Sequence, residues 1–280
     1  MKKELLTFKE TGNFSKKFLE FIEHDKESFF PNEKNILSTL SNINFSKYNR
    51  QVLSSELLNQ YSELKIRGKV NENIKSLLSE NTYTITTGHQ LNICTGPMYV
   101  IYKILSAIKL AHTLSKKYPE YNFVPVYWMA SEDHDFEEIQ SFHTQGVTHS
   151  WDIDAKGPVG NLDPSSLLET LNKIPSVLEI FRDAYRSSES LSQAVRKYMD
   201  SIFGDFGLVV IDPNSKVLKE SIQDIIEDDI INNSIETVEN SSKDPSDVHV
   251  RKINFFYQES QLRERIVKDK EYKVLSTNLS

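Results

Sequence analysis

The alternation of apolar and polar positions is most informative between residues 81 and 141, where it predicts a strand, a helix and a second strand. The β-branched run Thr84–Thr87 favours a strand, and the apolar run Val126–Ala130 favours another. Between them, residues 98–115 are apolar on nearly every side as far as Ala111, which predicts a buried helix. A strand, a helix and a strand of these lengths form a parallel βαβ unit with a right-handed crossover.

The start of the central helix is also marked in the sequence. Thr95 or Gly96 is the expected N-cap, and Pro97 then takes the first or second helical position, where its missing N–H does no harm. The residues before it, Gly88–Thr95, form a tight polar loop. Because ligands of parallel sheets bind beyond the carboxyl ends of the strands, this loop and the segment after the second strand are expected at one functional edge.

The remaining pattern extends this unit into an α/β domain. Helical spacing of apolar residues dominates residues 1–80, which we expect to pack as a helical region on the core. The apolar run Gly207–Ile211 is typical of a buried parallel strand. The expected core is therefore residues 81–214, with a helical insertion near 155–203, and residues 215–280 form a helix and the start of a connecting segment. The other predicted elements are strands at 147–153 and 253–257 and helices at 166–186 (interrupted or restarted at Pro175), 189–203 and 215–240.

Charge and cysteine content narrow the class of partner. The 280 residues include 33 Lys and Arg against 40 Asp and Glu, a formal charge of -7, which argues against nucleic acid as a partner. Cys94 is the single cysteine, so an intrachain disulfide and a cysteine-rich zinc site are excluded. The first residues contain no apolar stretch of signal-peptide length, and no stretch is long enough for a bilayer. We therefore expect a soluble, cytoplasmic protein.

The first candidate cluster is Gly88-His89-Gln90, at the end of the first predicted strand. A glycine there lets backbone approach a ligand closely, and the N–H groups at the start of the next helix favour a phosphate or carboxylate. His89 could donate to that anion or carry a proton. The alternative is structural: His89 caps backbone carbonyls and Gly88 only makes the turn.

The second cluster, Glu132-Asp133-His134-Asp135, directly follows the second apolar strand. Adjacent carboxylates raise one another's pKa, and a histidine beside them is pushed toward its charged form, which suits a general base or a hard-metal site. The alternative is a helix N-terminus decorated with acids, as the helix dipole prefers. Cys94 has no neighbour in the sequence placed to deprotonate it, so we interpret it as a small loop residue.

These residues together resemble a known family. Thr87-Gly88-His89-Gln90, then Thr95-Gly96-Pro97 with Tyr99, Tyr102 and Lys103, then Trp128 through Asp135, and finally Phe206-Gly207-Leu208 with Ile211-Asp212-Pro213, are similar to motifs of the cysteine-adding enzymes of bacillithiol biosynthesis, the BshC family. The motifs extend over residues 88–213 in the expected order. The combination is specific, although no single motif is.

The resemblance implies a fold and a reaction. The implied fold is a Rossmann-like parallel sheet similar to the class I nucleotidyltransferases and aminoacyl-tRNA synthetases, with inserted connecting segments. The implied reaction is a ligation that joins the carboxylate of cysteine to the amine of glucosaminyl malate, with ATP or another nucleotide as the possible activating cofactor. Members of this family continue into further strands and a coiled coil that pairs two subunits, so the chain is expected to be the amino-terminal part of a homodimeric enzyme.

Site roles follow from the motifs and the resemblance together. The expected catalytic residues are Asp133, His134 and Asp135. The expected substrate- or nucleotide-binding residues are Gly88, His89, Gln90, Asn92, Thr95, Gly96, Tyr99, Lys103 and Glu132. Gly88-His89 takes the place of the second half of the synthetase HxGH signature, and no resident metal is expected.

Two other functions remain open at this point. One is a metal-dependent hydrolase built on His89, Asp133, His134 and Asp135. The other is a binding module that keeps the fold and a nucleotide or ligand site without catalysis.

Overall fold

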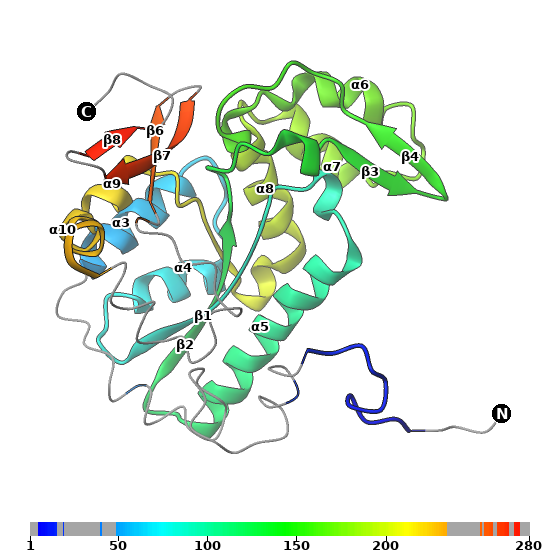
Figure 1. The fold of residues 1–280 in the computed structure, drawn as a ribbon. Helices are drawn as coiled ribbons and strands as arrows, with labels where there is room; N and C mark the ends of the chain where they lie inside the picture. Colours follow the sequence, from blue (N-terminus) through cyan, green and yellow to red (C-terminus); the bar gives the residue numbers. More distant parts are fainter. Residues whose placement is uncertain are drawn as a thin grey trace. The chain divides into compact units, whose positions relative to one another are not determined.

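The structure is a computed structural model that describes residues 5–15, 19, 40, 49–233, 253, 255–259, 262–268 and 272–274. Internal contacts divide the chain into two units, Met1–Lys47 and Tyr48–Ser280. In the first unit, the rings of Phe8 and Phe14 meet edge to face, 4.9 Å apart. Most of the helical region predicted before residue 49 lies outside the described residues, and everything below concerns the second unit (Figure 1).

A parallel sheet organises this unit. Within the described residues, the sheet contains β1 (Thr82–His89), β2 (Asn122–Met129) and β5 (Val209–Ile211), in the order β1-β2-β5. Gly88 lies opposite Trp128, and Trp128 lies opposite Ile211, so the three strands end side by side. The predicted parallel βαβ unit is confirmed, although β2 begins four residues before the predicted Val126.

Helix α5 (Met98–Lys117) makes the crossover between β1 and β2 and packs on both strands. Its buried positions Val100, Ile104, Ala107, Ile108, Ala111 and Leu114 form one stripe at helical spacing. The prediction that the helix is buried on nearly every side is wrong, because Met98 and Tyr102 are 66% and 65% exposed. Tyrosine and methionine can remain at a surface, since exposed apolar side chains are normal on proteins.

The predicted range of α5 begins at the right residue, Met98, but its predicted N-cap is wrong. Pro97 is the N-cap, with φ −68° and ψ 149°. Thr95 instead ends a short 3₁₀ helix, η2 (Ile93–Thr95), and Gly96 is the C-cap of that helix. Their φ angles of 73° and 67° are positive, which is incompatible with an N-cap that leads directly into the helix.

Helix α3 (Arg50–Gln60) packs on helix α4 (Gly68–Ser76), and α4 contacts β5. The Tyr61 hydroxyl accepts a hydrogen bond of 2.8 Å from the backbone N–H of Val210, and Gln60 Oε1 accepts one of 2.9 Å from the N–H of Asp212. Edge strands carry backbone groups that need such partners. The residues after α3 therefore supply to β5 the hydrogen bonds that another strand would otherwise make.

The segment that connects β2 to β5 is an insertion with both strands and helices. It contains the hairpin β3 (Ser141–Thr144) and β4 (Val147–Ser150), helices α6 (Leu167–Leu171), α7 (Glu179–Arg186) and α8 (Leu191–Phe203), and the 3₁₀ helices η3 (Phe136–Glu138), η4 (Val159–Asn161), η5 (Pro164–Ser166) and η6 (Gly204–Phe206). The predicted break at Pro175 falls between α6 and α7. Trp151 is fully buried, donates its indole N–H to Ser166 Oγ at 2.9 Å, and contacts Phe136 edge to face.

The segment after β5 differs from the sequence prediction. The expected helix over 215–240 is broken, within the described residues, into α9 (Lys216–Glu220), α10 (Gln223–Asp228) and the π-helical turn η7 (Asp229–Asn233). The Ser221 hydroxyl donates to the Leu218 carbonyl at 2.7 Å, the local side-chain-to-backbone bond that competes with a continuous helix. The strands β6 (Phe256–Glu259), β7 (Leu262–Lys268) and β8 (Tyr272–Val274) form an antiparallel sheet, of which only the first overlaps a predicted strand.

None of the helices in the described residues is long and apolar enough to span a bilayer.

We expect Tyr61→Phe to destabilise the protein by about 1–3 kcal/mol, because the buried N–H of Val210 loses its acceptor. Chemical denaturation measures this change. The matched control is Tyr102→Phe, since Tyr102 is 65% exposed, and its unfolding midpoint should not move. Equal midpoints for the two variants would show that the Tyr61 hydrogen bond does not stabilise β5.

Candidate active site

The carboxyl ends of the strands bring both predicted clusters together. Gly88 and His89 end β1, the Glu132–Asp135 segment follows β2, and Asp212 follows β5. Gln90 Nε2 donates to Asp133 Oδ2 at 3.1 Å and also to a carboxylate oxygen of Glu138. The expectation that the two clusters share one edge of the sheet is therefore confirmed.

His89 is held at both ring nitrogens. Nδ1 lies 2.8 Å from the Asn92 amide nitrogen and 3.2 Å from the Gln90 carbonyl oxygen, and Nε2 lies 2.6 Å from the hydroxyl oxygen of Tyr99. Nδ1 accepts from Asn92 in one ring tautomer and donates to Gln90 in the other, and Nε2 bonds the Tyr99 hydroxyl in both. Partial burial lowers the pKa of His89, with a further contribution from the charge of Lys103. His89 is therefore neutral near pH 7, and both of its ring nitrogens have hydrogen-bond partners, which favours a binding role over proton transfer.

The turn that holds Asn92 requires a glycine. Cys94, Thr95 and Gly96 have consecutive positive φ angles of 50°, 73° and 67°. A Cβ at Gly96 would lie 2.4 Å from Asn92 Cβ, a distance that no side chain can occupy. Such clustered backbone strain is characteristic of functional sites. Here it fixes Asn92, which in turn orients the His89 ring.

Cys94 has no features of a nucleophile. Burial raises the pKa of its thiol to about 12, and its backbone N–H donates to the Tyr185 hydroxyl at 2.9 Å. A thiol must ionise to react, so Cys94 is inert at neutral pH. The interpretation of Cys94 as a loop residue agrees with this environment.

Lys103 reaches back from α5 to the end of β1. Its ammonium donates to the Gly88 carbonyl at 2.5 Å. Gly88 itself lies close to β2, since a Cβ there would be 3.3 Å from the Trp128 carbonyl oxygen. Lys103 therefore lies within the candidate binding group, and its charge contributes to the neutral state of His89.

Asp133 accepts several hydrogen bonds at once. Besides Gln90, its Oδ1 accepts from the backbone N–H of His134 at 2.8 Å and of Asp135 at 3.3 Å. Burial alone would raise the pKa of Asp133, but these hydrogen bonds and the charge of Arg263 outweigh it and hold the pKa below its ordinary value. Asp133 is therefore a firmly ionised carboxylate and a poor proton acceptor at neutral pH.

His134 has one free ring nitrogen. Its Nδ1 lies 3.0 Å from the carbonyl oxygen of Glu132, and because a carbonyl only accepts, Nδ1 carries the proton. Nε2 is buried and has no hydrogen-bond partner within the described part of the chain. Burial, with the charge of Arg263, lowers the pKa of His134 and keeps the ring neutral. A neutral imidazole with an open lone pair is equipped to accept a proton.

The other two carboxylates of the segment are engaged. Glu132 forms an ion pair of 2.8 Å with Lys219 of α9. Asp135 accepts from the backbone N–H of Glu138 at 3.3 Å and so caps η3. For Asp135 this is the helix-capping role that was the alternative interpretation of the cluster.

Ligands for a metal ion do not gather here. Across the residues that the structure describes, no group of three or more His, Cys, Asp and Glu side chains is placed to hold a metal ion. The acids that the hydrolase hypothesis needs, Asp133 and Asp135, are bound by Gln90 and by backbone amides.

Several participants were not among the predicted site residues. Ser131 donates its hydroxyl to Asp212, and the buried Arg196 lies 4.0 Å from that carboxylate and donates to Gln60 at 3.2 Å. Asp212 also follows a strand, which is a signal that the sequence contains. Lys219 and Arg263 carry no comparable signal, because each contacts this loop only through the folding of a distant segment.

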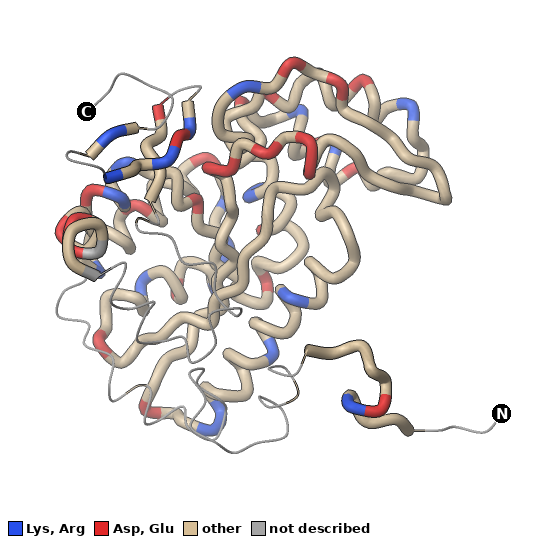
Figure 2. The backbone as a smooth tube through the Cα atoms, viewed as in Figure 1, with Lys and Arg blue, Asp and Glu red and all other residues tan. Residues whose placement is uncertain are grey.

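Figure 2 shows the acidic segment after β2 beside basic residues of the β6–β8 sheet.

A separate cavity of about 900 Å³ is lined by residues of the α3–α4 connection and of α7 and α8, including Arg67, Asp183 and Asp200. It contains none of the candidate site residues.

A parallel sheet with polar groups converging beyond its carboxyl ends is the arrangement of a Rossmann-like domain, in which ligands bind at that edge. Comparison with known families agrees, because the family described as "Bacillithiol biosynthesis BshC, N-terminal Rossmann-like domain" matches residues 1–280. The chain belongs to this family. Both the resemblance inferred from the motifs and the predicted fold class are thereby confirmed.

Individual relatives agree with the family match. A protein of Flavobacterium johnsoniae named "Putative cysteine ligase BshC" is 37% identical over 305 residues, which cover 100% of this chain and 57% of that relative. A protein of Cytophaga hutchinsonii with the same name is 36% identical over 290 residues, covering 99% of this chain and 56% of the relative. The chain thus spans somewhat more than half the length of the curated relatives it matches.

We expect Gly96→Ala to destabilise the protein by about 1–3 kcal/mol, because its backbone angles (φ 67°, ψ −145°) are accessible essentially only to glycine. The displaced Asn92 should also release His89, which is visible as a change in the ring signals of His89 in NMR spectra. Gly68→Ala is the matched control, since a Cβ there meets no atom within 4 Å. An unchanged His89 signal in the Gly96 variant would contradict this account.

Proposed function

We propose that this protein is a ligase that adds cysteine to glucosaminyl malate, forming an amide bond as the last step of bacillithiol synthesis. Support comes from membership of the BshC family and from relatives named as cysteine ligases. The chain covers only 57% of such a relative, so the activity is proposed for the protein of which this domain is a part. Its substrates are small molecules, and the cytoplasmic location and the homodimer remain predictions.

The observation that carries this proposal is the free lone pair of His134 Nε2 at the edge where the two clusters meet. In amide formation, the amine nitrogen attacks the carbonyl carbon of an activated cysteine. A C–N bond forms, the C–O bond to the activating group breaks, and the nitrogen loses a proton. We assign the acceptance of that proton to His134, because Asp133 is ionised but fully hydrogen-bonded.

Activation of the cysteine carboxylate is assigned to ATP or another nucleotide. The β1–α5 turn fits an anionic group of such a molecule. Pro97, the N-cap of α5, offers no side-chain cap, and Gly96 before it has no side chain. The first N–H groups of α5 and its dipole then favour negative charge. When bound, the nucleotide would supply the leaving group, while Tyr99, His89 and Asn92 keep the turn in shape.

The sharpest test of this assignment is His134→Ala. Removing a general base lowers kcat by about 10²–10⁴-fold while KM changes little. Cysteine addition to glucosaminyl malate is the assay, made with the complete gene product. The control is His143→Ala, because His143 lies exposed on β3 and its ring nitrogen Nδ1 contacts only Thr148, at 2.8 Å. Full activity of the His134 variant would show that another group takes the proton.

The pH profile provides a second test. His134 acts as a base only when neutral, and its pKa is lowered by burial, so activity should persist below the ordinary histidine value of about 6.5. As pH falls through the lowered pKa, the ring becomes protonated and kcat should fall in proportion. The fall of kcat at acid pH should be absent from the His134→Ala variant. If the residual activity of that variant still falls over the same pH range, the assignment is contradicted.

A further inference from the structure

We propose that Arg263 of β7 binds a carboxylate of the substrate, and that its contact with Asp133 is the resting contact that the substrate replaces. The inference rests on the proposed function and assigns one residue to the malyl group of glucosaminyl malate. It concerns a side chain that reaches the site from the β6–β8 sheet, far along the chain from the two clusters.

The distance between Arg263 and Asp133 shows an incomplete interaction. Arg263 Nη1 lies 3.8 Å from Asp133 Oδ1, which is within range of an ion pair but too long for a hydrogen bond. Asp133 already accepts from Gln90 and from two backbone amides. The Arg263 side chain makes no hydrogen bond with any residue that the structure describes. Its donors are therefore available.

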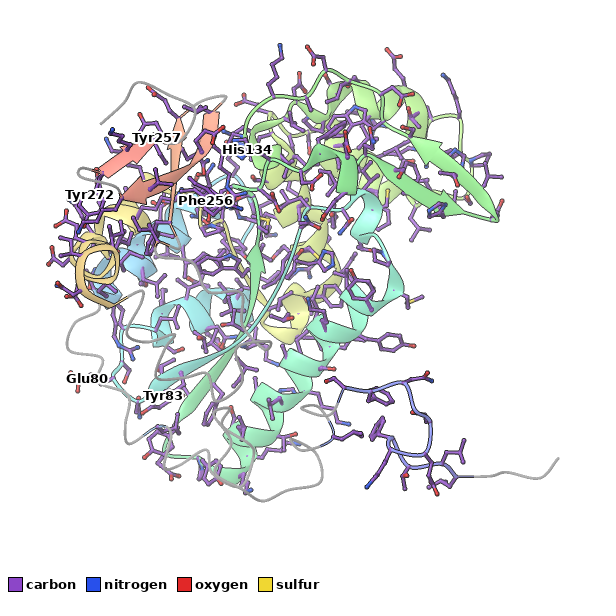
Figure 3. All side chains as sticks on the ribbon, in the orientation of Figure 1. Glu80, Tyr83, His134, Phe256, Tyr257 and Tyr272 are labelled. Atoms are coloured by element: carbon purple, nitrogen blue, oxygen red, sulfur yellow. The ribbon has the colours of Figure 1, made fainter. Side chains whose placement is uncertain are left out.

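The Arg263 side chain is held in a defined place without using those donors. Its guanidinium carbon lies 4.3 Å from the centre of the Phe256 ring, on the neighbouring strand β6. Stacking on an aromatic face uses the flat surface of the guanidinium and leaves its N–H edge open. Figure 3 shows Phe256 and His134 at the same part of the molecule. The side chain is 35% exposed, so a dissolved ligand can reach it.

The negative charges around the site require a positively charged residue to bind an anionic substrate. The Glu132–Asp135 segment and Glu138 present four carboxyl side chains at this edge, which would repel an anionic substrate. Lys219 is already bound to Glu132 at 2.8 Å and to Asn214 at 2.9 Å. Lys103 is bound to the Gly88 carbonyl. Among the described residues, Arg263 is the cation in contact with this acidic segment that has no hydrogen-bonded partner, and its planar guanidinium can bind both oxygens of a carboxylate.

The chemistry of the substrate fits this placement. Glucosaminyl malate carries its amine on the sugar carbon next to the one that bears the malyl group. A carboxylate of that group bound at Arg263 would therefore hold the amine near Asp133 and its neighbour His134, whose buried Nε2 has no hydrogen-bond partner among the described residues. Binding at Arg263 thus places the nucleophile beside the group that takes its proton.

The test measures binding of glucosaminyl malate and, separately, of ATP to the complete gene product by titration calorimetry. Arg263→Gln should weaken glucosaminyl malate binding about tenfold or more, because it removes charge-assisted hydrogen bonds. Arg263→Lys should recover part of the affinity, since it keeps the charge but not the planar fork. ATP binding should be the same in all variants. In the cysteine-addition assay, Arg263→Gln should raise KM for glucosaminyl malate and leave kcat nearly unchanged.

The matched control is Arg265→Gln, which removes the same charge from the same strand at a residue with no ion pair to the Glu132–Asp135 segment among the described residues. It should bind like the unmodified chain, and equal melting temperatures would show that all variants are folded. Equal weakening by the two glutamine variants would overturn the inference in favour of a general charge effect. Loss of ATP binding alone in Arg263→Gln would overturn it in favour of a phosphate contact.

The remaining outcomes separate this inference from the proposed function. If Arg263→Gln binds glucosaminyl malate as well as the unmodified chain, the role of Arg263 is wrong while the ligase assignment stands. If binding depends on Arg263 but the complete protein adds no cysteine, the binding role holds and the ligase assignment fails. Failure of the unmodified complete protein to bind glucosaminyl malate overturns both.

Discussion

The in-register parallel pairing of β1 with β2 is the constraint on which the site depends. His89 lies opposite Met129, and the pairing continues one step further, where the N–H of Ala130 donates to the His89 carbonyl at 3.0 Å. This bond brings Gln90 within reach of Asp133. A slip of two residues would keep each side chain on its face but move one strand by about 6.6 Å. The hydrogen bond between Gln90 and Asp133 could not survive such a shift, and the two clusters would separate.

The parts of this arrangement that depend on local sequence could be predicted. Strand, helix and strand follow from the β-branched run, the apolar helix and the second apolar run, and the carboxyl-edge rule then places both clusters. Errors arose where backbone geometry, not residue type, decides the outcome. The left-handed turn at Thr95–Gly96 makes Pro97 the N-cap of α5, and the Ser221 hydroxyl interrupts a helix whose apolar spacing continues beyond it.

Contacts between distant segments could not be predicted in the same way. Nothing in the composition of β7 indicates that Arg263 meets Asp133, or that Lys219 meets Glu132, because both contacts require the chain after β5 to fold back over the sheet edge. The state of His134 was misjudged for a related reason. From the sequence, neighbouring carboxylates should favour its charged form, but burial, together with the charge of Arg263, outweighs them and keeps the ring neutral.

The reaction proposed above needs a base near neutral pH, and the distribution of charge at this edge determines which group can supply it. Asp133, whose pKa is held below its ordinary value, is a weak base, and the carboxylates of the Glu132–Asp135 segment are occupied by Lys219, by Gln90 and by backbone amides. Their role is to shape the loop. That loop turns the Glu132 carbonyl toward His134 Nδ1, which fixes the ring proton there and leaves Nε2 open. In the proposed reaction the acids would therefore shape the loop, and the proton would be taken by His134, the neutral group among them.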